Sequence, residues 1–178
     1  MVSASVAPVA LIGGWSLAAA RQPSSYSPLR DTISALAAHG ATDPWIMTTG
    51  LAVLGTCHVV TASGLTEASS TGRALLAAGG LATIAVSALP QPSAGHAPAA
   101  TAGFIALALW PAASLVPRRR VGRIVTAGLV ALLGWLLVEL GDGALLGVSE
   151  RILAGAEALW PLAVALALSR RVTRTRPA

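Results

Sequence analysis

Residues 25–43 read SYSPLRDTISALAAHGATD, a stretch that is too polar to cross a membrane and too apolar to be a solvated tail. Ser27 is placed to cap a helix whose first residue is Pro28, a position where the missing N–H costs nothing, and Gly40 is a suitable stop. We therefore predict a short helix over about residues 28–38. Its apolar face would hold Leu29, Ile33, Leu36 and Ala37, with Arg30, Asp31 and Ser34 opposite, as expected of a helix at a membrane interface.

The composition outside this stretch is that of an integral membrane protein. Hydrophobic residues make up 54% of the 178 residues, charged residues make up 11%, and the mean hydropathy is +0.72. The net charge of +5 comes from Arg in blocks beside apolar runs, which indicates membrane orientation, and no nucleic-acid partner is expected. Cys57 is the single cysteine, so an internal disulfide is excluded.

Six apolar stretches are long enough to cross the hydrocarbon core as helices. They cover about residues 3–20, 44–65, 72–89, 96–116, 121–140 and 152–169. Apart from residues 21–43, the connections between them are short, which predicts antiparallel neighbours and hence an all-α, up-and-down bundle of six transmembrane helices forming one membrane domain over residues 1–178. Asp43 is placed to cap the second span. A five-span alternative, with the third or fourth stretch re-entrant, would break the charge pattern described next.

The Arg residues divide unevenly between the two sides of this bundle. Nine of them would lie on the side of the termini and three on the other side, so the positive-inside rule puts both termini in the cytoplasm. The nine are Arg73, Arg118, Arg119, Arg120, Arg123, Arg170, Arg171, Arg174 and Arg176. Residues 170–178 would form a basic cytoplasmic tail, and the loop that holds residues 21–43 would face outward.

Small residues within the spans are expected to let helix backbones approach closely in lipid. The examples are Gly79, Gly80, Gly103, Gly128 and Gly134.

Sparse acidic side chains gather toward the predicted outer side. Glu139 and Glu157 fall inside or at the end of spans, where facing lipid would cost about 2.5 to 3.5 kcal/mol, so both should face the bundle interior. Candidate partners at the same level are Arg30, Arg151, His39 and His96. The candidate ligand pocket is Tyr26, Arg30, Asp31, Ser34, His96, Glu139, Asp142, Glu150, Arg151 and Glu157.

Three interpretations of this cluster stay open. It could be a structural network that fixes the interfacial helix, with Arg30 or Arg151 paired to a carboxylate, a cavity for a lipid or other amphiphile, or the site of a membrane-embedded hydrolase or transferase. The spacings match no motif that dictates hydrolase or metal geometry, so no catalytic residue, metal or cofactor is assigned. His58 lies apart from this cluster, nearer the cytoplasmic end of its span. Haem ligation would need two His at matching depth on facing spans, and His39, His58 and His96 do not provide them.

The segment Tyr26 to Leu36, YSPLRDTISAL, resembles the signature that follows the first span in domain-of-unknown-function family 998, small bacterial membrane proteins. Pro90 with His96 and Ala99-Ala100, and the segment 147–151, are looser matches. The resemblance implies a six-span protein of the bacterial plasma membrane with no established activity. Carried over onto this chain, the motif residues expected to matter are Arg30, Asp31, Ser34, His96, Glu150 and Arg151.

Our working hypothesis from the sequence is a multi-pass protein of the plasma (inner) membrane that binds a lipid or small amphiphile in an outward-facing polar pocket. The enzyme and the purely structural or partner-binding subunit remain the alternatives. A transporter is disfavoured, because 178 residues make a small bundle unless the chain dimerises. Whether the chain forms a homo-oligomer is left open.

Overall fold

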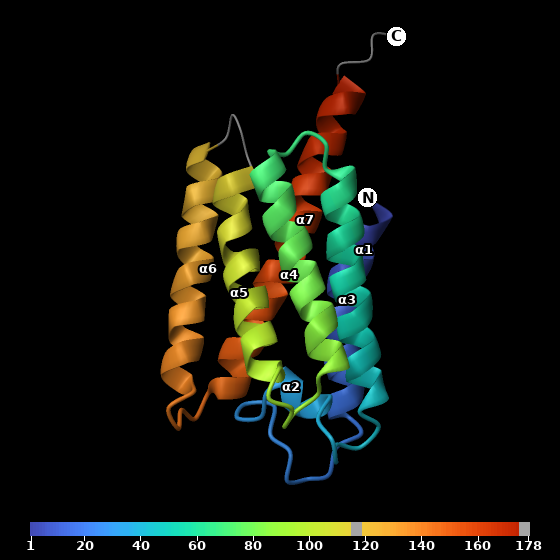
Figure 1. The fold of residues 1–178 in the computed structure, drawn as a ribbon, viewed down its shortest axis with the longest axis vertical. Helices are drawn as coiled ribbons and strands as arrows, with labels where there is room; N and C mark the ends of the chain where they lie inside the picture. Colours follow the sequence, from blue (N-terminus) through green and yellow to red (C-terminus); the bar gives the residue numbers. More distant parts are fainter. Residues whose placement is uncertain (115–118, 175–178) are drawn as a thin grey trace.

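The structure, a computed structural model, describes residues 1–114 and 119–174, with side chains for 1–114 and 120–169. Seven α-helices are found in these residues (Figure 1). Their bounds are α1 Val2–Ala19, α2 Ile33–Leu36, α3 Trp45–Gly64, α4 Ser70–Ala88, α5 His96–Ser114, α6 Arg119–Glu139 and α7 Leu146–Arg174. Arg118, Arg176 and the end of the predicted basic tail lie outside the described residues.

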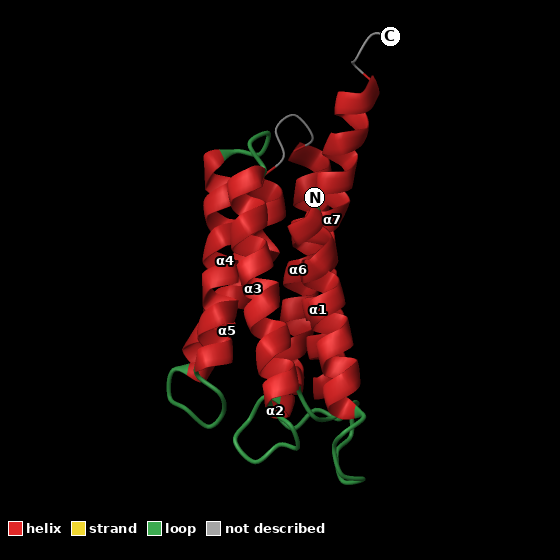
Figure 2. Cartoon of the chain, turned by 90° about the vertical axis from the view of Figure 1, so that its right-hand side faces the viewer, coloured by secondary structure: helices red, strands yellow, loops and turns green. Residues whose placement is uncertain are grey.

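Six of these helices, all but α2, are long and apolar enough to cross a membrane. They run up and down, joined by short connections except between α1 and α3, where residues 20–44 intervene, and both termini lie at the end of the bundle opposite α2 (Figures 1 and 2). This confirms the predicted six-span helical bundle. The third and fourth stretches form the full-length helices α4 and α5, so the five-span alternative is not supported.

The six long helices form a closed ring. Each packs against its neighbours in the order α1, α3, α4, α5, α6, α7, and α7 returns to pack against α1. Contacts across the ring, such as those of α7 with α3 and α5, are fewer. A ring of six helices leaves space along its axis, and the polar side chains described below face that space.

Helices α3 and α4 approach each other closely through two glycines. A Cβ atom on Gly55 would lie 2.5 Å from the carbonyl oxygen of Gly80, and one on Gly80 would lie 2.6 Å from the carbonyl oxygen of Gly55. These glycines therefore act as predicted for small residues in membrane helices. The same expectation is wrong for Gly128 and Gly134 of α6, because nothing lies within 4 Å of a Cβ there.

The interfacial helix is much shorter than expected. Turns occupy the first part of the segment, and α2 begins only at Ile33, with Thr32 as its cap: the Thr32 side chain accepts a hydrogen bond from the Ala35 N–H at 3.0 Å. The predicted cap at Ser27 is therefore wrong. The cap at Asp43 is wrong as well, because its carboxylate forms an ion pair with Arg21 at 2.8 Å and closes the ends of the loop.

Candidate ligand-binding site

The segment of residues 26–36 is docked on the first turn of α7. The first N–H groups of a helix have no partner within it, and here the carbonyl oxygen of Leu29 accepts hydrogen bonds from Gly147 N–H at 2.9 Å and Val148 N–H at 3.3 Å. Gly147 permits this contact, because a Cβ atom there would lie 2.4 Å from the Asp31 carbonyl oxygen and 2.5 Å from that of Pro28. The two stretches that carry the family resemblance therefore meet in space.

Arg151 fastens the same segment one turn further along α7. Its Nη1 donates to the carbonyl oxygens of Pro28 at 2.9 Å, Asp31 at 2.8 Å and Gly147 at 2.8 Å, and its Nη2 donates to the Tyr26 hydroxyl. The expected pairing of Arg151 with a carboxylate is thus replaced by bonds to backbone carbonyls and a phenol. We call Tyr26, Arg151 and these carbonyls the clasp.

Burial in the clasp raises the pKa of the Tyr26 phenol above its usual value of 10.0, and the neighbouring Arg151 charge offsets part of that rise. Tyr26 is the only tyrosine of the chain, so an absorbance titration reports this group alone. We expect tyrosinate to form above pH 10 in the folded protein and earlier after unfolding in detergent. Because the unfolded chain loses this proton first, the stability of the clasp should fall as the pH rises past 10. Equal midpoints in the two states would contradict the docked geometry.

Glu150 faces the other way, into the bundle, with 5% of its surface exposed. One carboxylate oxygen accepts a hydrogen bond from the backbone N–H of Ile33, and the other accepts one from the Ser34 hydroxyl at 3.4 Å. A buried carboxylate needs such donors, and α2 supplies them from its first turn. The short helix therefore positions Glu150 as well as covering it.

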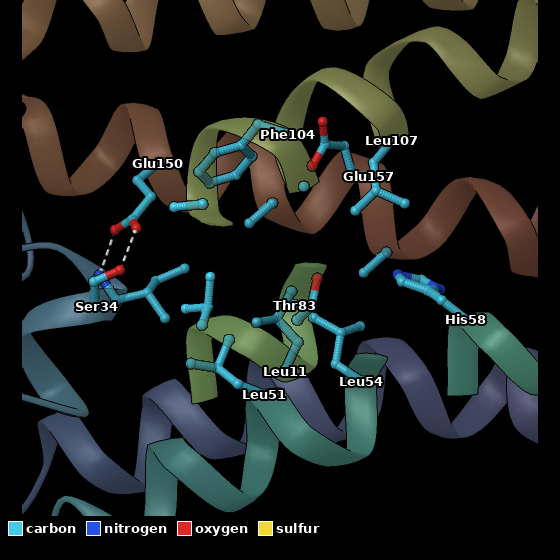
Figure 3. A pocket seen from close by; sticks show the side chains of 16 residues that line it. Leu11, Ser34, Leu51, Leu54, His58, Thr83, Phe104, Leu107, Glu150 and Glu157 are labelled. Atoms are coloured by element: carbon cyan, nitrogen blue, oxygen red, sulfur yellow. Dashed lines mark hydrogen bonds between the residues drawn. The ribbon is translucent and has the colours of Figure 1, made fainter. Parts of the chain in front are cut away.

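Glu150 and Ser34 line one end of a cavity on the bundle axis, which we call the central cavity. Its polar residues are Ser34, His58, Thr83, Glu150 and Glu157, and apolar residues such as Leu54 and Leu107 form the rest of its wall. Figure 3 shows Glu150 and Ser34 at one end, His58 at the other, and Glu157 and Thr83 between them. Its volume is about 60 Å³. That is room for roughly four waters, since one water needs about 10 to 15 Å³.

His58 belongs to this cavity, which the sequence analysis missed. The imidazole is fully buried, with 0% exposed surface, and lines the same space as Glu157. The sequence could have indicated this, because α3 and α7 start at the same end of the bundle and the depth of a residue can be counted from the start of its helix. His58 lies 13 residues after Trp45 and Glu157 lies 11 residues after Leu146. At 1.5 Å per residue, both are therefore roughly 16 to 20 Å deep.

A second, larger space, which we call the outer groove, adjoins Glu150 and Ser34 between α5, α6 and α7. It has a volume of about 200 Å³. Its polar end holds Thr32, Ser34, Gln91, His96 and Glu150, and its apolar wall includes Ile105, Leu133, Leu137 and Leu140. His96 Nδ1 lies 2.8 Å from the Leu89 carbonyl oxygen. Since a carbonyl only accepts, Nδ1 carries a hydrogen, and Nε2 is left as an acceptor when the ring is neutral.

Arg30 and Asp31 lie outside both spaces. The Arg30 side chain is exposed, and the Asp31 carboxylate accepts a hydrogen bond from the Ser27 N–H of its own turn at 2.6 Å. Asp31 therefore stabilises the turn that presents carbonyl oxygens to the clasp.

The remaining predicted residues serve the connection between α6 and α7 or lie at the surface. The Glu139 carboxylate accepts hydrogen bonds from the Trp135 indole at 3.0 Å and the Leu145 N–H at 2.8 Å. Asp142 is exposed in the same connection, and His39 is exposed in the loop that follows α2. The structure thus brings together Ser34, His96, Glu150 and Glu157 around the two spaces, and Tyr26 and Arg151 beside them.

The polar groups of the two spaces determine which contacts a bound molecule could make. Ser34 and Glu150 are 3.4 Å apart, longer than the usual reach between a nucleophile and its base, and the neighbouring Ile33 N–H is occupied by Glu150. Within the described part of the chain, no group of three His, Cys, Asp or Glu side chains could hold a metal ion. Carboxylate oxygens, an imidazole and hydroxyls remain as ligand contacts.

Six apolar spans define a multi-pass integral membrane protein. The sequence model of a family described as Protein of unknown function (DUF998) matches residues 5–167. The chain therefore belongs to this family, as the segment of residues 26–36 predicted. No curated protein and no solved structure matches the chain.

Proposed function

We propose that this protein binds an amphiphile in the outer groove, with the head of the ligand at Ser34, His96 and Glu150 and its chain along α5 and α6. The observation that carries the proposal is the groove itself, which joins buried polar groups at one end to Leu133, Leu137 and Leu140 on a face that meets the lipid. Such a gradient from polar to apolar suits a molecule with the same gradient.

The polar end of the groove favours a head that donates hydrogen bonds and carries no negative charge. Glu150 and His96 Nε2 offer acceptors, whereas no arginine is among the described residues that line the groove, and the chain has no lysine. Arg151 is engaged by three carbonyls and a phenol. An anionic phosphate would therefore meet a carboxylate without a cation, which disfavours it. A hydroxyl or an amine head fits better.

The Arg distribution supports the orientation that we propose for this site. With the nine Arg on the side of the termini in the cytoplasm, the outer groove and the clasp would face the outside of a bacterial plasma membrane. The ligand would then enter from the outer leaflet.

The test measures binding to the full chain in mild detergent by native mass spectrometry. The ligands are a monoacylglycerol, a long-chain amine and a lysophosphatidate. We expect the first or the second to bind and the third not to bind. Ala97→Leu should fill the groove and weaken the observed binding about tenfold, because it removes space and about 1.4 kcal/mol of contact.

Ala127→Leu is the matched control, since Ala127 is exposed on α6 and outside the groove. It should bind as the wild type does. Glu150→Gln distinguishes the two kinds of head group. Loss of the carboxylate charge should weaken binding of the long-chain amine far more than binding of the monoacylglycerol. Equal effects of the two Leu substitutions, or binding of the lysophosphatidate alone, would rule out this site.

A further inference from the structure

We propose that the chain also conducts protons across the bilayer, along a file of buried side chains that runs from Glu150 through Glu157 to His58 and on to Thr61 at the opposite end of the bundle. Ionisable side chains in a bundle interior are costly to keep in a membrane, and in pumps and transporters they mark proton paths. This proposal does not require an amphiphile, although the two proposals share Ser34 and Glu150, which line both the central cavity and the outer groove.

The middle of the file consists of two fully buried groups without a partner. Glu157 has 1% of its surface exposed and its Oε1 has no hydrogen bond, and His58 has 0% exposed and neither ring nitrogen has one. Both line the central cavity, which has room for several waters. Buried polar atoms are almost always satisfied by protein or water. Waters between these groups would satisfy them and join them into a chain.

The outer end of the file is open through the groove. Glu150 and Ser34 line both the central cavity and the outer groove, so one carboxylate adjoins both spaces. Glu157 follows Glu150 by seven residues, which is two helical turns on the same face of α7.

The other end of the file opens at a third space, the inner cavity, at the end of the bundle that holds the termini. It has a volume of about 340 Å³, and Ser3, Thr61, Thr66 and Glu67 are among its lining residues. Thr66 and Glu67 are exposed, so water reaches it. Thr61 is three residues after His58 on the same face of α3 and lies 2.9 Å from the Ser3 hydroxyl oxygen. His58 of the central cavity and Thr61 of the inner cavity are therefore neighbours one turn apart on α3.

The transfer needs no other reactant. A proton enters onto the Glu150 carboxylate, passes through water to Glu157, and is taken by one nitrogen of His58 while the other nitrogen releases a proton toward Thr61 and the inner cavity. Each group gains one proton and loses one, and the proton gradient across the membrane supplies the direction. Rotation of the imidazole then restores the starting state.

Few other charged groups face this file. Helix α1 contains no ionisable side chain. In α4, Arg73 donates to the carbonyl oxygens of Ala62 at 2.8 Å and Ser63 at 3.1 Å, near the inner end of the bundle. In α5, His96 is bonded to Leu89 at the outer end. His58, Glu150 and Glu157 are therefore the ionisable groups of the central cavity among the described side chains.

The experiment places the full chain in vesicles of phosphatidylcholine and phosphatidylglycerol that enclose a pH-sensitive dye. A potassium diffusion potential set with valinomycin drives protons inward. Wild-type protein should acidify the interior faster than vesicles without protein. Glu157→Gln and His58→Phe should each reduce this rate to that of the protein-free vesicles, whereas Glu157→Asp should keep part of it.

Thr56→Val is the matched control, because Thr56 lies two residues before His58 on the exposed face of α3 and bonds only its own helix, at the Ala52 carbonyl oxygen. It should conduct as the wild type does. A wild-type rate equal to that of protein-free vesicles would overturn the proposal, and so would full conduction by Glu157→Gln or His58→Phe. Should both variants fail to fold, infrared spectra of the wild type decide. The absence of a carboxylic-acid band that responds to pH would equally overturn the proposal.

Discussion

Replacing Gly55 by Val is expected to lower the free energy of unfolding by about 3 kcal/mol. Overpacking typically costs about 1 to 3 kcal/mol, and the upper end applies here because the neighbouring atoms belong to the backbone. A Cβ atom there would lie 2.5 Å from the Gly80 carbonyl oxygen and 2.9 Å from the Ile84 nitrogen, neither of which can move without moving α4. The added isopropyl group therefore has to push α3 and α4 apart. The measurement is the fraction folded in mixed micelles as denaturing detergent is added.

Gly128→Val is the control for this prediction. It makes the same chemical change within a long helix, at a position where nothing lies within 4 Å of the added Cβ atom. It should leave the denaturation midpoint nearly unchanged. Equal losses in the two variants would mean that helix propensity, rather than the close contact of α3 and α4, sets the effect.

Arg151→Met is expected to destabilise the docked segment of residues 26–36 by about 3 kcal/mol, since hydrogen bonds to charged groups contribute about 1.5 to 3 kcal/mol each and Arg151 is only half-buried. The substitution keeps an unbranched apolar stem but removes the donors to three carbonyls and to Tyr26. Hydrogen exchange at the amides of α2 should become faster, while exchange in α3 and α4 should stay slow.

Two further variants sharpen this test. Arg30→Met removes an exposed Arg of the docked segment itself and should leave the exchange of α2 unchanged. Arg151→Lys should be almost as harmful as Met, because an ammonium group cannot reproduce the planar fork that reaches both the phenol and the carbonyls. Full protection of α2 in the Lys variant would show that charge alone fastens the segment.

The architecture was predictable because the lipid core imposes it. A span needs about 20 apolar residues, and six such stretches predict six spans that alternate in direction, which the six long helices follow (Figure 1). The membership of the family was predictable for a different reason. The segment of residues 26–36 carries a specific pattern, and the structure explains it, since Gly147 and Arg151 bind its carbonyl oxygens.

The details that failed depend on contacts that are distant in sequence. Serine is a residue type that often caps helices, so Ser27 was a reasonable prediction. However, backbone carbonyl oxygens that would accept hydrogen bonds within a longer helix accept them instead from Arg151 and from the first turn of α7. The faces of α6 could not be assigned either, because an apolar helix offers no polar face to mark its lipid side, so Gly128 was expected to pack. The charge blocks orient the spans but do not show that His58 and Glu157 lie at a similar depth in the membrane. That similarity follows only from counting residues from the starts of α3 and α7.

The closing contact of the ring, between the first helix and the last, has a consequence for the order of assembly during synthesis. Helix α1 is made before its partner α7, and five other helices lie between them in the chain. Until then His58 has no acidic neighbour and the segment of residues 26–36 has no helix to dock on. A chain interrupted before residue 146 would therefore lack the helix that closes the ring, and the faces of α1 and α6 that pack against α7 would stay open to lipid.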